Sequence, residues 1–214
     1  MSRIRIVAPG AGEIIGDSPE RRVEILSDAD PLHATLSRFG PGREGADLHI
    51  HTQHSDIFYV LEGELTVRLG VEDKPVVVPA GALARVPPDV VHGFRNASDA
   101  DLRYLNFHAP GCDFANYMRA LRDGRKLAYD QHDPPADGGR PISEAVVEPS
   151  GETSVEAITV TRVDGSAAHD GERLASYYVL EGELELGGER APAGAFVQAS
   201  EPHTATGSFL KIVS

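Results

Sequence analysis

The chain is poor in the residues and segments that are typical of secreted and membrane proteins. Its 214 residues include a single cysteine and no tryptophan. One cysteine cannot form an internal disulfide, which favours a reducing compartment. No apolar run approaches the roughly 18 residues of a membrane-spanning helix, and the first residues lack the apolar core of a secretory signal. We therefore expect a cytoplasmic protein without a membrane partner.

Basic residues are also scarce. Lysine and arginine total 20 against 33 aspartates and glutamates, so the formal charge is -13. An acidic surface repels nucleic acids, and we expect no nucleic-acid partner. Turn-forming residues are abundant instead, with 22 glycines and 15 prolines. Short strand-like runs separated by such turns predict an all-β sandwich or barrel.

Ten runs have the composition of strands, and one segment has that of a helix. The helix is expected at Phe114–Arg122, with Asp113 as its N-cap and Gly124 after its last turn. The expected strands are Arg3–Val7, Val23–Leu26, His33–Phe39, Asp47–His51, Ile57–Leu61, Glu64–Leu69, Pro75–Val78, Ala82–Val86, Gly93–Asn96 and Leu102–His108.

An internal repeat indicates two domains of one type. The seven residues Tyr59–Leu65 recur unchanged as Tyr178–Leu184, at an offset of 119. Pro79–Gly81 and His92 then recur in the same order, as Pro192–Gly194 and His203. The Pro/Gly-rich segment 130–141 has the composition of a linker. We predict a first domain at residues 1–129, a linker at 130–141 and a second domain at 142–214.

Polar residues around the first copy have the types and spacing of a metal site. His49 and His51 are two residues apart, so on a strand both side chains point to the same face. Asp56 follows them and His92 comes after a Pro-rich turn. Three imidazoles and one carboxylate suit a divalent transition metal.

The same residues carry a family resemblance. His49, His51, Asp56 and Gly63 approach the motif G-x5-H-x-H-x3,4-E-x6-G, and Gly81, Pro87, His92 and Asn96 approach G-x5-P-x-G-x2-H-x3-N, with Asp89 at its middle glycine. These are the paired motifs of the cupin superfamily, which includes quercetin-dioxygenase-like and germin-like proteins. The chain resembles a bicupin. The resemblance implies two tandem double-stranded β-helix (jelly-roll) barrels with one short helix between them.

The resemblance also implies a ligand set. His49, His51, Asp56 and His92 would hold one divalent transition metal per chain, which could be Fe, Mn, Ni, Zn, Co or Cu. The family usually has glutamate where Asp56 stands, and aspartate is one methylene shorter. His54 is therefore a second candidate for the fourth ligand; it is alternatively a group that orients a ligand, or an exposed loop residue.

The second copy is expected to lack this site. Counting back from Gly182 places Ala168, Asp170 and Ala175 at the positions of the first two histidines and the aspartate. His203 remains, and His169 is one residue out of register. Such a slip would turn His169 to the opposite face of its strand.

Further residues are candidates for a substrate pocket in the first barrel. We expect Tyr59, Arg85, Phe94 and Asn106 to line it, and His54 and His108 to move protons near the metal. Arg85 and Arg95 either neutralise a substrate carboxylate or only offset the acidic surface.

The resemblance and the ligand set together favour an enzyme. The first hypothesis is a mononuclear metal-dependent oxygenase, a dioxygenase-type cupin acting on a small enol or phenolic substrate. The second is a redox-neutral isomerase, cyclase or lyase, and the third is a non-catalytic cupin that binds a small molecule. We expect a homodimer, because barrels of this kind expose sheet edges and apolar faces.

Overall fold

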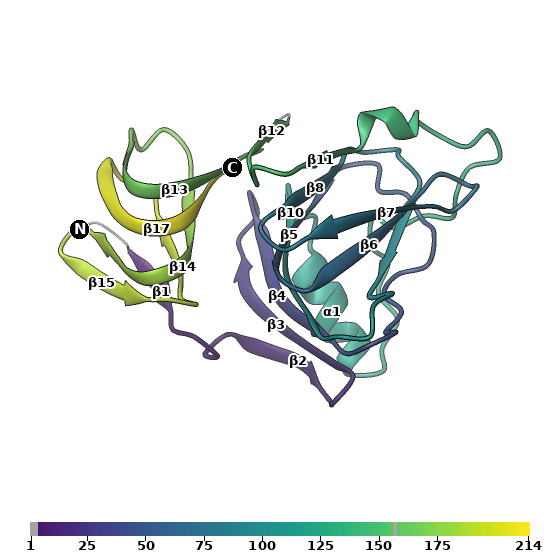
Figure 1. Ribbon diagram of the computed structural model, residues 1–214, viewed down its shortest axis with the longest axis horizontal. Coiled ribbons are helices and arrows are strands. Elements are labelled where there is room, and N and C mark those ends of the chain that lie inside the picture. Colours follow the sequence, from purple (N-terminus) through teal and green to yellow (C-terminus); the bar gives the residue numbers. More distant parts are fainter. Residues whose placement is uncertain (1–3, 156–157) are drawn as a thin grey trace. The chain divides into compact units, whose positions relative to one another are not determined.

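The chain forms two compact units, which a computed structural model describes over residues 4–155 and 158–214. The central unit is Ile14–Ser150, and the split unit combines Met1–Glu13 with Gly151–Ser214 (Figure 1). The split unit takes in the amino-terminal residues because β1 (Arg5–Val7) pairs antiparallel with β16 (Phe196–Ala199). Arg3, the first residue of the strand expected there, lies outside the described residues.

The central unit consists of two antiparallel sheets. A seven-stranded sheet has the order β11-β8-β5-β10-β4-β3-β2, and a three-stranded sheet has the order β7-β6-β9. The expectation of an all-β fold is confirmed. The strands are β2 (Glu13–Asp17), β3 (Arg21–Asp28), β4 (His33–Phe39), β5 (Ser55–Glu62), β6 (Glu64–Leu69), β7 (Lys74–Pro79), β8 (Leu83–Val86), β9 (His92–Arg95), β10 (Leu102–Ala109) and β11 (Val146–Glu148).

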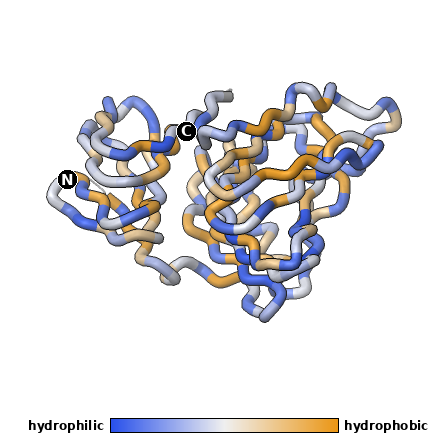
Figure 2. The backbone as a smooth tube through the Cα atoms, in the orientation of Figure 1, coloured by the Kyte–Doolittle hydropathy of each residue, from blue (hydrophilic) through white to orange (hydrophobic). Residues whose placement is uncertain are grey.

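Alternation along the strands builds the core of this unit. Phe58 and Val60 of β5 point inward and meet Leu65 and Val67 of β6 in one buried cluster. Figure 2 shows hydrophobic stretches along the strands and hydrophilic segments at the turns between them. Gly63 makes the turn from β5 to β6 at φ +76°, where a Cβ would lie 2.4 Å from the carbonyl oxygen of Asp101. The repeated sequence therefore needs glycine at its centre.

The expected helix is present as α1 (Phe114–Arg122). Ala115 and Met118 pack against Val23 and Ile25 of β3, so the helix covers part of the central unit's sheet. Asp113 precedes α1 in the left-handed region, and its side chain makes no capping hydrogen bond. Among residues 4–155 and 158–214, no helix is long and apolar enough to cross a membrane.

The split unit is a seven-stranded antiparallel sheet with the path β1-β16-β14-β17-β13-β12 and with β15 beside β14. The repeated sequence lies in β14, as its first copy lies in β5 and β6. Its core contains Tyr177, Val179, Leu184 and Phe209. The remaining elements are β12 (Thr153–Val155), β13 (Ile158–His169), β14 (Ala175–Leu186), β15 (Glu189–Pro192), β17 (His203–Val213) and the 3-10 turn η1 (Ile142–Glu144), which belongs to the central unit.

The division between the units differs from the predicted boundaries at 129 and 142. Residues 130–141 are not a free linker, because the Asp130 side chain is buried and Arg140 donates a backbone hydrogen bond to the carbonyl of Asp89. Beyond them, β11 adds to the edge of the central sheet by pairing with β8. The composition of a linker was present, but each of these contacts ties the segment to the central unit.

Candidate metal centre

The four candidate ligands come from three places in the central unit. Asp56 lies in β5 and His92 begins β9. His49 and His51 precede β5 in a segment that makes isolated bridges, His49 with His92 and Ile50 with His132. The expected strand Asp47–His51 is therefore wrong as a strand. The bridges still hold the segment so that both imidazoles reach the same place.

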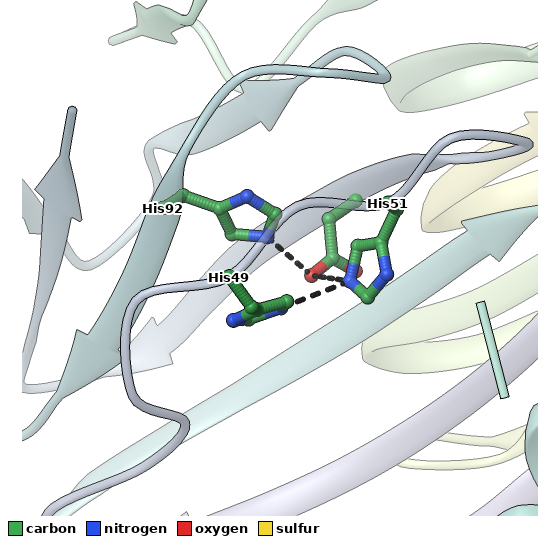
Figure 3. A group of neighbouring side chains, drawn as sticks. His49, His51 and His92 are labelled. Atoms are coloured by element: carbon green, nitrogen blue, oxygen red, sulfur yellow. Dashed lines mark hydrogen bonds and ion pairs between the residues drawn. The ribbon is translucent and has the colours of Figure 1, made fainter. Parts of the chain in front are cut away.

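The structure brings these four side chains together inside the unit. One ligand atom from each of His49, His51, Asp56 and His92 lies within 4.8 Å of the others, and all four residues are at most 5% exposed. Figure 3 shows the three imidazoles turned toward one another. The arrangement is a buried cluster with the donor set of a transition-metal site.

The backbone fixes the orientation of each imidazole. His49 Nδ1 donates to the carbonyl of Asp47 at 2.7 Å, and His92 Nδ1 donates to that of Val90 at 2.9 Å. His51 Nδ1 donates to the carbonyl of Asp130. In the neutral form of each ring the proton is on Nδ1, so that Nε2 presents a lone pair to the centre of the cluster.

The contact between two of these nitrogens indicates that the cluster favours a positive charge. His49 Nε2 and His51 Nε2 are 3.0 Å apart. A hydrogen bond between them needs an imidazolium, because each Nδ1 already donates to a carbonyl. Burial and the neighbouring His92 and His51 lower the pKa of His49 to about 3. Burial also disfavours a charged His51, but hydrogen bonding and the charge of Asp56 outweigh it and raise the pKa of His51. The proton therefore belongs to His51, and a metal ion between the nitrogens would replace it.

Asp56 uses its two oxygens differently. Oδ2 faces the cluster, 3.2 Å from His92 Nε2 and 3.7 Å from His51 Nε2. Oδ1 accepts a hydrogen bond from Asn106 Nδ2 at 2.9 Å and lies 2.5 Å from His108 Nε2. Burial raises the pKa of Asp56, but these histidines outweigh it and hold the pKa well below its usual range. The shorter carboxylate therefore reaches the cluster as an anion with one oxygen anchored.

His54 lies beside the cluster rather than in an exposed loop. Its Nδ1 is 3.0 Å from Asp130 Oδ2 and its Nε2 is 2.8 Å from the Tyr129 hydroxyl. Together with His51 and Asp130 it forms a second group of donor atoms within 4.8 Å. The Asp130 oxygens already accept hydrogen bonds from Thr52 and Gln53, which occupies that carboxylate.

A chain of hydrogen bonds connects two buried carboxylates through His54 and His108. Tyr129 OH contacts His54 Nε2 at 2.8 Å and His108 Nδ1 at 3.0 Å, so the sequence of groups is Asp130, His54, Tyr129, His108 and Asp56. Four contacts need four protons, whereas two neutral imidazoles and one phenol supply three. Burial lowers the pKa of both histidines, that of His54 to about 3. With both histidines neutral, this series of hydrogen bonds can therefore accept one more proton.

The Asp130 end of this series of hydrogen bonds lies next to an exposed residue. His132 Nε2 lies 3.1 Å from Asp130 Oδ1, and the His132 side chain is 52% exposed. Tyr129 and Asp130 were not expected to take part, because they lie at the start of the segment with linker composition. Nothing in their local sequence indicates a buried role; only the fold brings them to residues about 76 positions earlier.

A cavity of about 250 Å³ opens from the cluster toward α1. It is lined by metal-site residues (His49, His51, Asp56), by polar neighbours (Thr35, Ser37, Asn106, His108, Gln131), by apolar side chains (Val23, Phe39, Phe94, Tyr104, Phe114, Met118) and by the charged residues Arg21, Arg43 and Glu44. Phe94 and Asn106 are therefore placed as expected.

Tyr59 and Arg85 do not line this cavity. Asp56 and Phe58 point into the barrel, and Tyr59 follows Phe58 in the strand and points to the other face. The same alternation in β8 turns Ala84 inward and Arg85 outward. The sequence alone had placed the two residues near the site without deciding the face.

Comparison with known proteins agrees with this geometry. Residues 35–108 match the family model of the cupin domain. The central unit therefore contains a cupin domain. A stretch of 120 residues of the chain is 27% identical to quercetin 2,3-dioxygenase of Bacillus subtilis, covering 55% of the chain and 34% of that enzyme. The chain thus matches about a third of the length of this curated relative.

Solved structures share the fold along nearly the whole chain. A bacterial pirin from Escherichia coli in complex with nickel(II) has a TM-score of 0.68 at 14% identity, covering 99% of this chain and 98% of the pirin. An oxalate decarboxylase from Bacillus subtilis has a TM-score of 0.63 at 12% identity, covering 100% of this chain and 77% of the decarboxylase. At such identities the likeness concerns the fold.

The second copy of the site differs from the expectation in one respect. His169 pairs directly with His203 across β13 and β17, as His49 pairs with His92. The two rings lie 5.2 Å apart, so His169 is on the same face and not on the opposite one. The position of His169 follows from the pairing of β13 with β17. Counting back from Gly182 gave the wrong position, because the turns that connect the strands differ in length between the two copies.

Proposed function

We propose that the central unit is a mononuclear metal-dependent oxygenase for a small enol or phenolic substrate. His49, His51, Asp56 and His92 would hold one divalent transition metal. The observation that carries the proposal is the convergence of three Nε2 lone pairs, each fixed by a carbonyl at Nδ1, on one carboxylate oxygen. When bound, a redox-active metal supplies a centre at which an organic substrate becomes reactive toward oxygen.

The surrounding residues are suited to that reaction. Phe39, Phe94 and Phe114 line the cavity with apolar surface, which excludes water and accepts an aromatic substrate. Asn106 holds Asp56 Oδ1 at 2.9 Å and thereby orients the carboxylate. The resemblance to quercetin 2,3-dioxygenase over part of the chain supports an oxygenase among the possible metal-dependent activities.

A second candidate is a redox-neutral isomerase, cyclase or lyase. The hydrogen-bonded chain through His54, Tyr129 and His108 favours it, because this chain has room for a proton taken from a substrate. His108 Nδ1 lies 3.0 Å from the Tyr129 hydroxyl, and His108 also lines the cavity. In this reaction the metal would act as a Lewis acid and His108 would pass the proton away from the substrate.

Metal analysis and oxygen uptake test the two candidates. The full chain, purified without an affinity tag, is expected to contain close to one transition-metal ion per chain. A double variant, His49→Ala with His51→Ala, is expected to contain none. Oxygen consumption with enol and catechol substrates would support the oxygenase. Proton exchange or isomerisation without oxygen uptake would support the second candidate, and an unchanged metal content in the double variant would contradict both.

A further inference from the structure

We propose that Arg21 binds an anionic group of the substrate, so that the cavity takes a molecule with a metal-binding oxygen at one end and a carboxylate at the other. This inference rests on the proposed metal centre and adds the substrate's charge to it. It concerns a residue outside the ligand set and outside the hydrogen-bonded chain. The argument combines the surroundings of Arg21, its place on the sheet and the charge of the protein.

Arg21 has no counter-ion among the described residues. It lies at the start of β3 and lines the cavity that contains the metal cluster. Its Nε is buried and has no hydrogen-bond partner among the residues that the structure describes. Within those residues no carboxylate lies within ion-pair distance of its guanidinium. A buried N–H that lacks an acceptor is unfavourable unless a ligand supplies one.

An unpaired arginine is unexpected in this protein, which has 33 acidic and 20 basic residues. Most arginines of the central unit do have a carboxylate nearby. These pairs are Arg22–Asp17, Arg38–Asp101, Arg68–Asp73, Arg95–Glu44, Arg103–Glu62, Arg119–Asp28, Arg122–Asp123 and Arg140–Glu144. Carboxylates are plentiful, so the lack of one beside Arg21 leaves its charge available to a ligand.

The strand register places Arg21 on the face that carries the metal cluster. Across the sheet, His108 pairs with Asp56. Arg21 pairs with Phe39, whose other partner is Leu102, six residues before His108 in β10. Six residues of strand span about 20 Å. The long Arg21 side chain and a small aromatic or aliphatic acid together bridge this distance.

The space between Arg21 and the metal cluster is lined by apolar side chains together with two small hydroxyl residues. Val23, Phe39 and Tyr104 line it beside Thr35 and Ser37. The guanidinium carbon of Arg21 lies 5.8 Å from the centre of the Phe39 ring. A ring contact of this kind holds the guanidinium while leaving its N–H groups free to bind a planar anion. A carboxylate could then accept two parallel hydrogen bonds from the arginine.

The other arginines considered are less suited to this role. Arg95 pairs with Glu44 at 3.3 Å, and Arg85 is on the opposite face of its strand. Arg43 also lines the cavity, but its side chain is exposed. Its charge also acts on Glu20, whose pKa is lowered by backbone and Ser18 hydrogen bonds and, to a smaller extent, by Arg43. We therefore assign to Arg21 the anion-binding role that was one of two alternatives for Arg85 and Arg95.

Titration with a matched pair of ligands tests the proposal. The nickel(II)-loaded full chain is titrated with dihydrocaffeate and with its primary amide, which share the catechol and differ in the carboxylate. We expect the acid to bind about 10- to 100-fold more tightly than the amide. Arg21→Gln should abolish this preference, and Arg21→Lys should keep part of it. Melting temperature and metal content show whether each variant is folded.

Two control variants distinguish a local contact from a general charge effect. Arg22→Gln removes the same charge one residue further on, from the opposite face, and should retain the preference; Arg43→Gln should reduce it only slightly. If the wild type loads nickel but binds acid and amide equally, or binds neither, the role of Arg21 is disproved and the metal centre stands. If the chain loads no metal, the proposed function fails first.

Discussion

The two units share one fold and one pair of facing histidines, but they differ in how those histidines are used. In the central unit His49 pairs with His92, and in the split unit His169 pairs with His203. In the first, both Nε2 atoms point to a shared centre. In the second, His203 Nε2 contacts the Tyr177 hydroxyl at 2.6 Å and His169 Nε2 contacts a backbone carbonyl at 2.9 Å. In the split unit the Nε2 atoms of the equivalent histidines bond to other protein groups, so these histidines have a structural role.

The missing ligands explain the difference. Asp56 corresponds to Ala175 in the repeat, and the residue two after His169 is Gly171. Gly171 has φ +83°, and a Cβ there would lie 2.6 Å from Pro202 Cδ. A histidine equivalent to His51 would therefore be strained in the split unit. The split unit thus forms its sheet and core without such a cluster.

The largest effect is expected from removing the matched histidine of each unit. His92→Ala deletes one of three imidazole donors, so metal affinity should fall by more than about 100-fold, beyond the effect of losing a supporting residue. His203→Ala should leave affinity unchanged, because its nitrogens are already bonded. Competition with a chelator measures both. An equal loss of metal affinity in the two variants would show that both units contribute to metal binding.

The residue that supports Asp56 should have the next largest effect. Asn106→Ala removes the hydrogen bond to Asp56 Oδ1, and metal affinity should fall by about 10- to 100-fold. Lys211, at the corresponding place in β17, serves as the control, and Lys211→Ala should bind metal normally. Chelator competition at fixed pH is the measurement. An Asn106→Ala variant with wild-type affinity would show that Asp56 is oriented by other contacts.

Acid should destabilise the metal-free protein, mainly through the central unit. The pKa of His49 is about 3 in the folded state against an ordinary 6.5, so between these values the unfolded chain binds the additional proton and stability falls as pH falls. One such group contributes about 1.4 kcal/mol per pH unit. Urea unfolding at pH 7, 6 and 5 should show this slope, and His49→Gln should flatten it. A slope unchanged by His49→Gln would contradict the assignment.

The smallest effect should come from the hydroxyl that bonds His203. Tyr177→Phe removes one hydrogen bond, and we expect a loss of about 1 kcal/mol in the free energy of unfolding. Metal content should not change. Calorimetry of the metal-free and metal-loaded protein checks both statements, and a drop in metal content would mean that the split unit supports the site.

Local patterns in the sequence predicted much of this molecule. The seven-residue repeat predicted two related units, and the spacing of His49, His51, Asp56 and His92 predicted which side chains meet. Alternating and helical patterns located most strands and α1. Each of these predictions depends on residues close in sequence, or on a motif whose spacing already encodes the fold.

Contacts between distant residues were not predictable in this way. Arg5 bonds Gln198 and β1 pairs with β16, so the boundary between the units could not be read from composition. Tyr129 and Asp130 enter the buried chain from a segment with turn-forming composition. Arg21 is an unremarkable strand residue until its neighbours are known. In each case a partner far along the chain decides the role.

The division of the split unit between the two ends of the chain has a consequence for synthesis. All of the central unit, Ile14–Ser150, leaves the ribosome before the strand that β1 must pair with has been made. The metal-type barrel can therefore close cotranslationally, whereas β1 waits for Phe196–Ala199 with its own edge unpaired. The nascent chain could thus acquire its ion before its second barrel exists.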